Sequence, residues 1–164
     1  MTKLITRRAS LQIGAAALAT PFLARGATAQ TAHVVEMLNV HPENPRLRQV
    51  FFPRLIVVEP GDTVNFTATD RGHNSMSVDG MLPDGAEPWN GRINADIEVT
   101  FDVSGVYGYV CQPHATVGMV GVVVVNGDDA LSNLEAVQGV RQRGAAAGIF
   151  EEIWAELAEL DLSA

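Results

Sequence analysis

The sequence predicts an all-β protein, a β-sandwich that is followed by two helices near the C-terminus. Three observations lead to this fold class. Seven or eight short segments either alternate apolar and polar residues or run continuously apolar, as strands do. Turn residues such as Pro60-Gly61 and Ser104-Gly105 separate these segments at short intervals. Towards the end of the chain, the apolar residues change from the spacing of strands to that of helices.

The strands are predicted from their apolar pattern. In chain order they span 33–40, 55–59, 62–68, 76–78, 97–101, 106–111 and 120–125. Val64 and Phe66 point to one face of their strand, and their polar neighbours point to the other. The segment 120–125 is almost continuously apolar, which is typical of a central strand covered on both faces. The segment 41–49 is interpreted as a loop.

Two helices are predicted after the last strand. The first spans 131–137 and begins after Asp128 or Asp129 as its cap. The second spans 144–160. Its apolar face consists of Ile149, Ile153, Leu157 and Leu160, with Phe150 and Trp154 beside it. We expect this helix to dock on an edge or a face of the sandwich, and the alternative is a helix that binds a partner.

The first 29 residues are predicted to be an export signal of the twin-arginine type. Residues 6–11 read TRRASL, an apolar stretch follows at 11–23, and small residues at 27–29 suit a cleavage site. The apolar stretch is too short for a membrane anchor. We therefore expect a periplasmic protein that starts near Gln30. The predicted parts are the signal, 1–29; the sandwich, 30–126; and a helical extension packed on it, 127–164.

The part that follows the signal is strongly acidic. It contains seven arginines and no lysine against 19 acidic residues, which gives a net charge of −12. About 135 residues remain there, enough for one domain with its own core. Such a chain should avoid nucleic acid and anionic membranes and should favour a basic partner. We expect it to be a monomer that does not insert into the membrane.

One short segment concentrates residues that bind metals. Cys111, the only cysteine, is followed by His114 and Met119, and His73 lies upstream in a separate loop. A single cysteine cannot form an internal disulfide. One thiolate, two imidazoles and one thioether form the donor set of a mononuclear copper site that transfers electrons. The sequence therefore predicts one copper ion, bound by these four residues.

The neighbouring residues suit this prediction. The strand 106–111 would deliver Cys111 at its end, and the following loop would carry His114 and return Met119 at the start of the next strand. Pro113 would stiffen that loop, and Gly118 would let the backbone pass close to the metal. The two remaining histidines, His33 and His41, are interpreted as ordinary surface or edge residues.

Several motifs closely resemble those of the pseudoazurins, a family of type 1 blue copper proteins with the cupredoxin fold. They are PGDTV at 60–64, GHN at 72–74, GMLPDGAE at 80–87, GVYG at 105–108, CQPH at 111–114, GMVGVV at 118–123 and NLEAV at 133–137. The resemblance spans nearly the whole chain after the signal. It implies a Greek-key cupredoxin sandwich with two C-terminal helices and a type 1 copper.

The resemblance also implies roles for single residues. His73, Cys111, His114 and Met119 would be the ligands. Behind them, Asn74 would hold the two ligand loops together, and Pro113 would support the ligand loop. The exposed edge of His114 would be surrounded by an apolar docking patch, which consists of Met81, Pro83, Ala115 and Val117. Pseudoazurins usually surround this edge with lysines that dock on acidic reductases, and this chain has none after the signal.

These observations predict a diffusible one-electron carrier. Its partners would be redox proteins, such as a reductase, a cytochrome c or a dehydrogenase, and denitrification is one pathway it could serve. The chain is too small, and has too few histidines, for a copper nitrite reductase, and one cysteine cannot build a binuclear copper centre. We therefore predict an electron-transfer protein and not an enzyme. The alternative is a periplasmic protein for copper storage or delivery.

Overall fold

The computed structural model describes residues 30–162, and the predicted export signal lies outside them. Eight strands form two sheets, and two α-helices follow. The strands are β1 (Ala32–Val40), β2 (Arg48–Phe52), β3 (Leu55–Val58), β4 (Asp62–Thr67), β5 (Met76–Ser77), β6 (Ile97–Phe101), β7 (Gly105–Val110) and β8 (Val120–Val125). The helices are the 3₁₀-helix η1 (Gln112–Val117), α1 (Leu134–Gly139) and α2 (Ala146–Ala158). This architecture confirms the predicted sandwich with two C-terminal helices.

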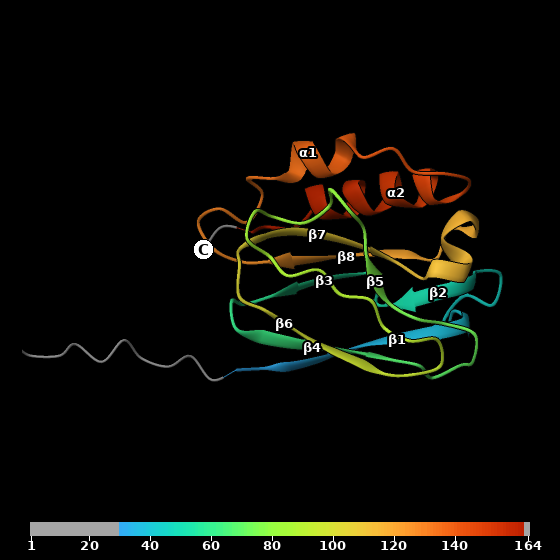
Figure 1. Ribbon diagram of the computed structural model, residues 1–164. Coiled ribbons are helices and arrows are strands. Elements are labelled where there is room, and N and C mark those ends of the chain that lie inside the picture. The colour runs from blue at the N-terminus through green and yellow to red at the C-terminus, as the bar shows by residue number, and fades with distance from the viewer. Residues whose placement is uncertain (1–29, 163–164) are drawn as a thin grey trace, which may run out of the picture.

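The two sheets are mixed. One has the order β2-β1-β4-β6 and the other β3-β8-β7-β5. β1 is parallel to β4 and β3 is parallel to β8, whereas the other neighbours are antiparallel. Because consecutive strands often belong to different sheets, the chain crosses repeatedly between the two layers (Figure 1). The strand directions place the ends of β1, β4 and β7 at one end of the sandwich. β5, β6 and β8 begin at that same end.

The main core lies between the sheets and is rich in aromatic rings. Phe66 stacks on Trp89 with ring centroids 5.8 Å apart, and Tyr109 packs edge-on against Phe66 and Phe51 at 4.9 and 4.7 Å. Val64 and Phe66 are both fully buried, as their alternation in the strand predicts. The aromatic residues pack in the orientations that aromatic pairs prefer, and they fix the distance between the two layers.

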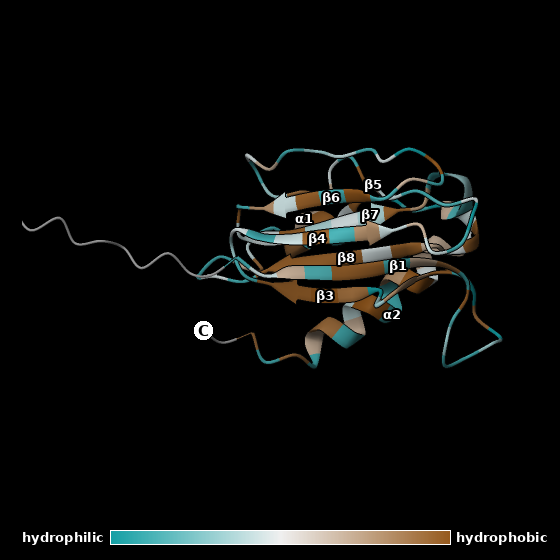
Figure 2. Ribbon diagram, turned by 90° about the horizontal axis from the view of Figure 1, so that it is seen from below, coloured by the Kyte–Doolittle hydropathy of each residue, from teal (hydrophilic) through white to brown (hydrophobic). Residues whose placement is uncertain are grey.

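A second core lies between the β3-β8-β7-β5 sheet and the helices. α2 packs on β8 and β3, and α1 packs on β7, so that both helices cover the outer face of this sheet (Figure 1). All six residues of β8 are buried, which confirms a strand covered on both faces. Figure 2 shows the corresponding apolar colouring along β3 and most of β8. No helix in the described part of the chain is long and apolar enough to cross a membrane.

The structure differs from the predicted elements at β2 and at the start of α1. β2 lies within residues that were read partly as a loop, because its polar first residues hide the strand pattern. Helix α1 begins at Leu134 instead of 131, and neither Asp128 nor Asp129 caps it. The residue before the helix, Asn133, binds the backbone of Val106 through its side-chain amide. The amide oxygen accepts from the Val106 N–H at 2.9 Å, and the amide nitrogen donates to the Val106 carbonyl at 2.9 Å.

The buried face of α2 is also rotated from the predicted one. The buried residues are Ala146, Phe150, Ile153, Trp154 and Leu157. Ile149 is only half-buried, and Leu160 lies beyond the helix with 42% of its surface exposed. Phe150 and Trp154 stack on each other and are buried in the core between the sheet and the helices. The helix nevertheless docks on a face of the sandwich, as expected.

Candidate metal centre

Three side chains converge at the end of the sandwich where β4 and β7 terminate. Their ligand atoms, in His73, Cys111 and His114, all lie within 4.8 Å of one another. Cys111 Sγ is 3.7 Å from His73 Nδ1 and 3.5 Å from His114 Nδ1, and the two Nδ1 atoms are 3.2 Å apart. His73 and Cys111 are fully buried, whereas His114 is half-buried.

This triangle of donor atoms fits a single metal ion. Its centre lies about 2.0 Å from each of the three atoms, which is close to the length of bonds from nitrogen and sulfur to a first-row metal ion. Without a metal, two imidazole nitrogens and a sulfur would crowd together in a buried space. One thiolate and two imidazoles in a trigonal array are typical of copper sites that transfer electrons.

His73 is positioned by the segment 68–75, which follows β4. Its Nε2 lies 3.1 Å from Asn39 Oδ1 on β1, so this nitrogen donates and Nδ1 keeps a free lone pair towards Cys111. Asn39 is held in turn, because its backbone N–H donates to the Asp70 carboxylate at 2.7 Å. Burial, and to a lesser extent the charge of His114, lowers the pKa of His73. The imidazole is therefore kept neutral, as a metal ligand requires.

Cys111 immediately follows β7 and precedes η1. Its backbone N–H donates to the Met119 carbonyl at 2.9 Å, which closes the ligand loop. Burial raises the pKa of the thiol, while backbone N–H groups of Asn74 and His114 oppose this rise. Hydrogen bonds from these amides favour the thiolate, the form that binds a metal. A bound cation would supply the remaining stabilisation.

The ligand loop forms a short 3₁₀-helix instead of an irregular loop. Pro113 lies in its first turn, where its missing N–H costs nothing, and Gly118 ends it in the left-handed conformation with φ of 99°. A Cβ on Gly118 would lie 2.9 Å from the Ile149 side chain on α2. This glycine is thus needed for the turn and for close approach to the helix, and its predicted role of letting the backbone pass close to the metal stays a prediction.

Met119 lies beside the donor triangle. It is fully buried and belongs to the same core cluster as Cys111. Its backbone N–H donates to the His114 carbonyl at 3.1 Å, and its carbonyl accepts from Cys111. The main chain of Met119 is therefore tied to two of the three metal-binding residues.

Two asparagines connect the loops around the triangle. Asn74 accepts from the Gln112 N–H at 2.8 Å and donates to the Gly91 carbonyl at 3.0 Å. Asn94 accepts from the Gly72 N–H at 2.5 Å, and its own N–H donates to the His73 carbonyl at 2.8 Å. The segments that carry His73 and Cys111 are thus bound to each other and to 90–96.

The predicted docking patch is wrong for two of its four residues. Met81 is 1% exposed and packs against Gly108 and the helices, and Pro83 is buried against Gly105. Gly105 begins β7 whereas Cys111 follows its end, so Pro83 lies about 20 Å along the strand from the metal-binding residues. Both were placed near His114 by the resemblance alone, whereas the segment 81–87 runs from the middle of β7 towards the opposite end of the sandwich. Ala115 is half-buried and Val117 is 58% exposed, and both lie in η1 next to His114.

Sequence reasoning missed Asn39 and Asn94. Asn39 is the penultimate residue of a strand, and nothing in the spacing distinguishes it from a polar edge residue. Asn94 has a φ of 65°, which asparagine tolerates better than most residues, but an asparagine in a loop is not by itself a signal. The interpretation of His33 and His41 agrees with the structure: His33 pairs with Asp62, and His41 packs edge-on against Phe52.

Comparisons with known proteins agree with this geometry. Residues 38–126 match the family model of copper binding proteins, plastocyanin/azurin family. The chain is 37% identical to a pseudoazurin of Methylorubrum extorquens, over 88% of this chain and 95% of that protein. It is 38% identical to a pseudoazurin of Paracoccus pantotrophus, over 91% and 97%. A solved pseudoazurin from Sinorhizobium superimposes with a TM-score of 0.75 at 42% identity, covering 79% of this chain and 98% of that one.

The fold and the donor triangle together define a cupredoxin, a copper protein built on a β-sandwich. Within the plastocyanin/azurin family, the chain belongs to the pseudoazurins. Its cofactor is one copper ion of type 1, which confirms the prediction from the donor set.

Proposed function

We propose that the protein is a diffusible one-electron carrier of the periplasm. The observation that carries this proposal is the buried triangle of Cys111, His73 and His114, in which only His114 is half-exposed. Copper bound there would gain or lose one electron as it changes between copper(II) and copper(I). Two of the three ligands are buried, and only the imidazole edge of His114 reaches the surface. An electron can pass through that edge, whereas a substrate could not reach the metal.

The residues of the chain would keep this site rigid. Asn39 fixes the ring of His73, and Asn74 joins the two ligand segments. Met119 would supply a weak fourth donor, because it is buried in the same core cluster as Cys111 and a thioether suits a copper that changes oxidation state. Pro113 stiffens the first turn of η1. The ligands would therefore move little when an electron arrives or leaves.

We propose that partners approach along the exposed edge of His114. Ala115 and Val117 extend from the same 3₁₀-helix and remain the predicted docking residues. The partner would be a redox protein, such as a reductase, a cytochrome c or a dehydrogenase, and the carrier would act as a monomer. The twin-arginine signal predicted at residues 1–29 supports the periplasmic location, and denitrification is one pathway that the carrier could serve.

Copper storage or delivery is the alternative function. A delivery protein must release its ion to a partner, which favours exposed ligands. Here two of the three triangle residues are fully buried, and Asn74 and Asn94 bind the surrounding loops together. The burial of the ligands therefore favours electron transfer over the exchange of copper.

Absorption and voltammetry distinguish the two functions. The copper(II) protein should show an intense visible band from the thiolate and a reversible one-electron wave. A colourless protein, or one that loses its copper to a mild chelator within minutes, would support storage or delivery instead.

A further inference from the structure

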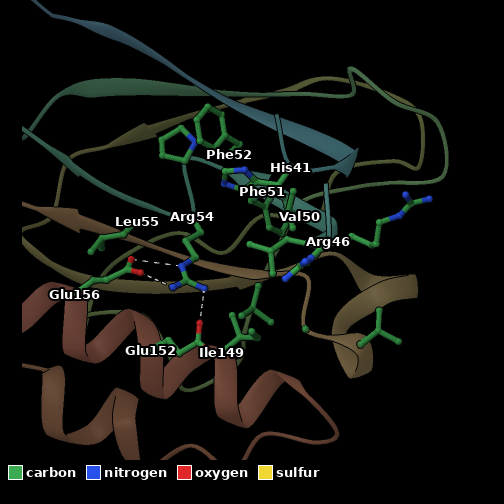
Figure 3. Close-up of a pocket in the computed structure, with 16 residues that line it drawn as sticks. His41, Arg46, Val50, Phe51, Phe52, Arg54, Leu55, Ile149, Glu152 and Glu156 are labelled. Atoms are coloured by element: carbon green, nitrogen blue, oxygen red, sulfur yellow. Dashed lines mark hydrogen bonds and ion pairs between the residues drawn. The ribbon is translucent and has the colours of Figure 1, made fainter. Parts of the chain in front are cut away.

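A groove of about 530 Å³ lies next to the metal centre, on the side of helix α2 (Figure 3). Its floor is apolar and includes Val50, Phe51, Leu55 and Ile149. The loop between β1 and β2 forms one wall, and α2 forms the other. At one end the groove is closed by Val117 and Gly118, which precede the Met119 of the ligand loop. A molecule in this groove would therefore touch the loop that carries His114.

The charged residues around the groove are not balanced. On the α2 side, Arg54 donates to Glu152 at 2.9 Å and forms a second ion pair with Glu156, as the dashed lines in Figure 3 show. Arg54 is thereby paired, and its two glutamates leave that wall with a net charge of −1. On the opposite wall, Arg46 and Arg48 are exposed and form no ion pair within residues 30–162. One wall of the groove thus presents two free positive charges.

Exposed apolar side chains lie beside these arginines. Leu47, between them in sequence, is 42% exposed, and Val117 at the end of the groove is 58% exposed. An apolar floor with a charged rim has the composition of a protein interface and not of a site for a small ion. The two arginines supply the sign of charge that the partner must complement.

We propose that this groove docks an acidic segment of the electron-transfer partner. Carboxylates of the segment pair with Arg46 and Arg48, and an apolar side chain between them packs on Leu55 and Ile149. The proposal rests on the proposed function, since the occupant is the redox partner. It is opposite to the expectation from the net charge of −12, which favours a basic partner, because the groove presents a local positive charge.

Peptide binding to the reduced, copper-loaded protein tests the proposal. The probe is an acetylated and amidated peptide, Glu-Asp-Leu-Phe-Asp-Glu, titrated at low salt and followed by amide chemical shifts. Shifts should concentrate at Val50, Leu55, Val117 and Ile149. The control peptide replaces every acidic residue by lysine and should leave these signals unchanged. Acidic-peptide shifts that fall elsewhere, or stronger shifts with the basic peptide, would overturn the proposal.

Matched charge variants separate the groove from the net charge. The double variant Arg46→Glu/Arg48→Glu should weaken binding of the acidic peptide by about tenfold or more. The control Arg92→Glu/Arg141→Glu changes the net charge equally at two exposed arginines that do not line the groove, and should weaken it less than about twofold. Equal weakening in the two variants would refute a specific groove. Visible absorption and voltammetry of each variant should stay unchanged, which shows that the copper site is intact, whereas absence of both signals in the parent protein would contradict the proposed function.

Discussion

The two ends of the sandwich carry opposite charge. At the copper end, the connecting segments 41–47, 68–75, 90–96 and 111–119, together with Arg48 at the start of β2, contain four arginines and three carboxylates. At the opposite end, the segments 59–62, 102–104 and 126–130 contain five carboxylates and no basic residue. A negative protein therefore has an end that is nearly neutral or slightly positive, and that end holds the metal.

This difference teaches that net charge is a poor guide to the partner. A net charge of −12 describes the field far from the molecule, whereas a docking partner within about 10 Å feels the nearest charges most strongly. The separation of charge also makes the molecule a dipole, which would turn its copper end towards a negatively charged surface.

The two ends also differ in how they are held together. At the copper end, side-chain amides of Asn39, Asn74 and Asn94 connect loops to one another. At the opposite end, strands are joined by the buried carboxylate of Asp62 and by aromatic packing around Phe101. We infer that chemistry depends on the first end and stability on the second, and the following changes test that division.

Removal of the thiolate should have the largest effect. Cys111→Ala should abolish the visible band and the voltammetric wave completely, because the remaining donors cannot form a type 1 site. The sandwich should stay folded, since its two cores do not require the metal. Visible absorption and far-ultraviolet circular dichroism measure the two results. A coloured variant would contradict the assignment of the site.

A substitution in the core near the opposite end should affect stability and not the copper site. Phe101 is 1% exposed and packs on Tyr107 and Trp89 with ring centroids 5.0 and 5.7 Å away. Phe101→Ala should lower the free energy of unfolding by about 3–5 kcal/mol, measured in denaturant on the metal-free protein. The visible band of the copper-loaded variant should be unchanged. The exposed control Val34→Ala should cost less than about 0.5 kcal/mol.

The carboxylate of Asp62 gives the opposite end a pH dependence. Burial acts to raise its pKa, but hydrogen bonds from His33 and from the N–H groups of Thr31 and Glu59 outweigh it and lower the pKa. Its stabilisation is therefore present above the unfolded pKa and is lost as pH falls through the lower, folded pKa.

Asp62→Asn should thus lower the free energy of unfolding at pH 7 by about 1–2 kcal/mol. The difference from the parent protein should shrink as pH falls below about 4, where the carboxylate becomes protonated. Denaturant curves at several pH values check both. A difference that does not change with pH would show that the charge of Asp62 is not what stabilises this end.

At the copper end, Met119 should help to set the reduction potential of the copper without affecting the fold. Met119→Gln should retain copper and lower the reduction potential by about 60 mV or more, because a harder oxygen donor favours copper(II). Voltammetry measures the shift. An unchanged potential would show that Met119 is packing and not a ligand. The matched change Met37→Gln, in the core at 0% exposure, should lower stability and leave the potential where it is.

The smallest effect is expected from the surface of the copper end. Val117→Glu should slow electron transfer to an acidic redox protein several-fold, roughly 1 kcal/mol in activation free energy, without moving the potential. The measurement is the stopped-flow rate with an acidic reductase and with a basic cytochrome c, each at low and at high salt. It shows whether the charges of the copper end or the net charge of the whole protein governs docking. If the basic protein reacts faster at low salt, the net charge dominates docking and the local arginines do not.

The sequence predicted most of the fold and the donor set. Strands with regular apolar alternation, such as β4 and β6, were identified because their pattern is local. Cys111, His114 and Met119 were grouped because they lie within nine residues of one another. His73 was joined to them by its residue type and by the family resemblance.

The remaining details depend on contacts distant in sequence. Asn39 supports His73 across 34 positions of sequence, and Asn133 binds Val106 across 27. No periodicity reveals such pairs. Met81 and Pro83 were assigned to the docking patch by the family resemblance, but Met81 is buried against the middle of β7 and Pro83 lies beside its first residue. The charge separation was missed because it appears only when the loops are assigned to ends.

The contact between the ligand loop and α2 has a consequence for how the protein uses its copper. Gly118 abuts Ile149, and the Thr116 carbonyl accepts from the Ala145 N–H at 2.8 Å where the helix begins. We therefore expect the contact with the C-terminal helix α2 to restrict movement of η1. Because ligands that move little give a low reorganisation energy, we infer that the helical extension favours fast electron transfer as well as a stable fold.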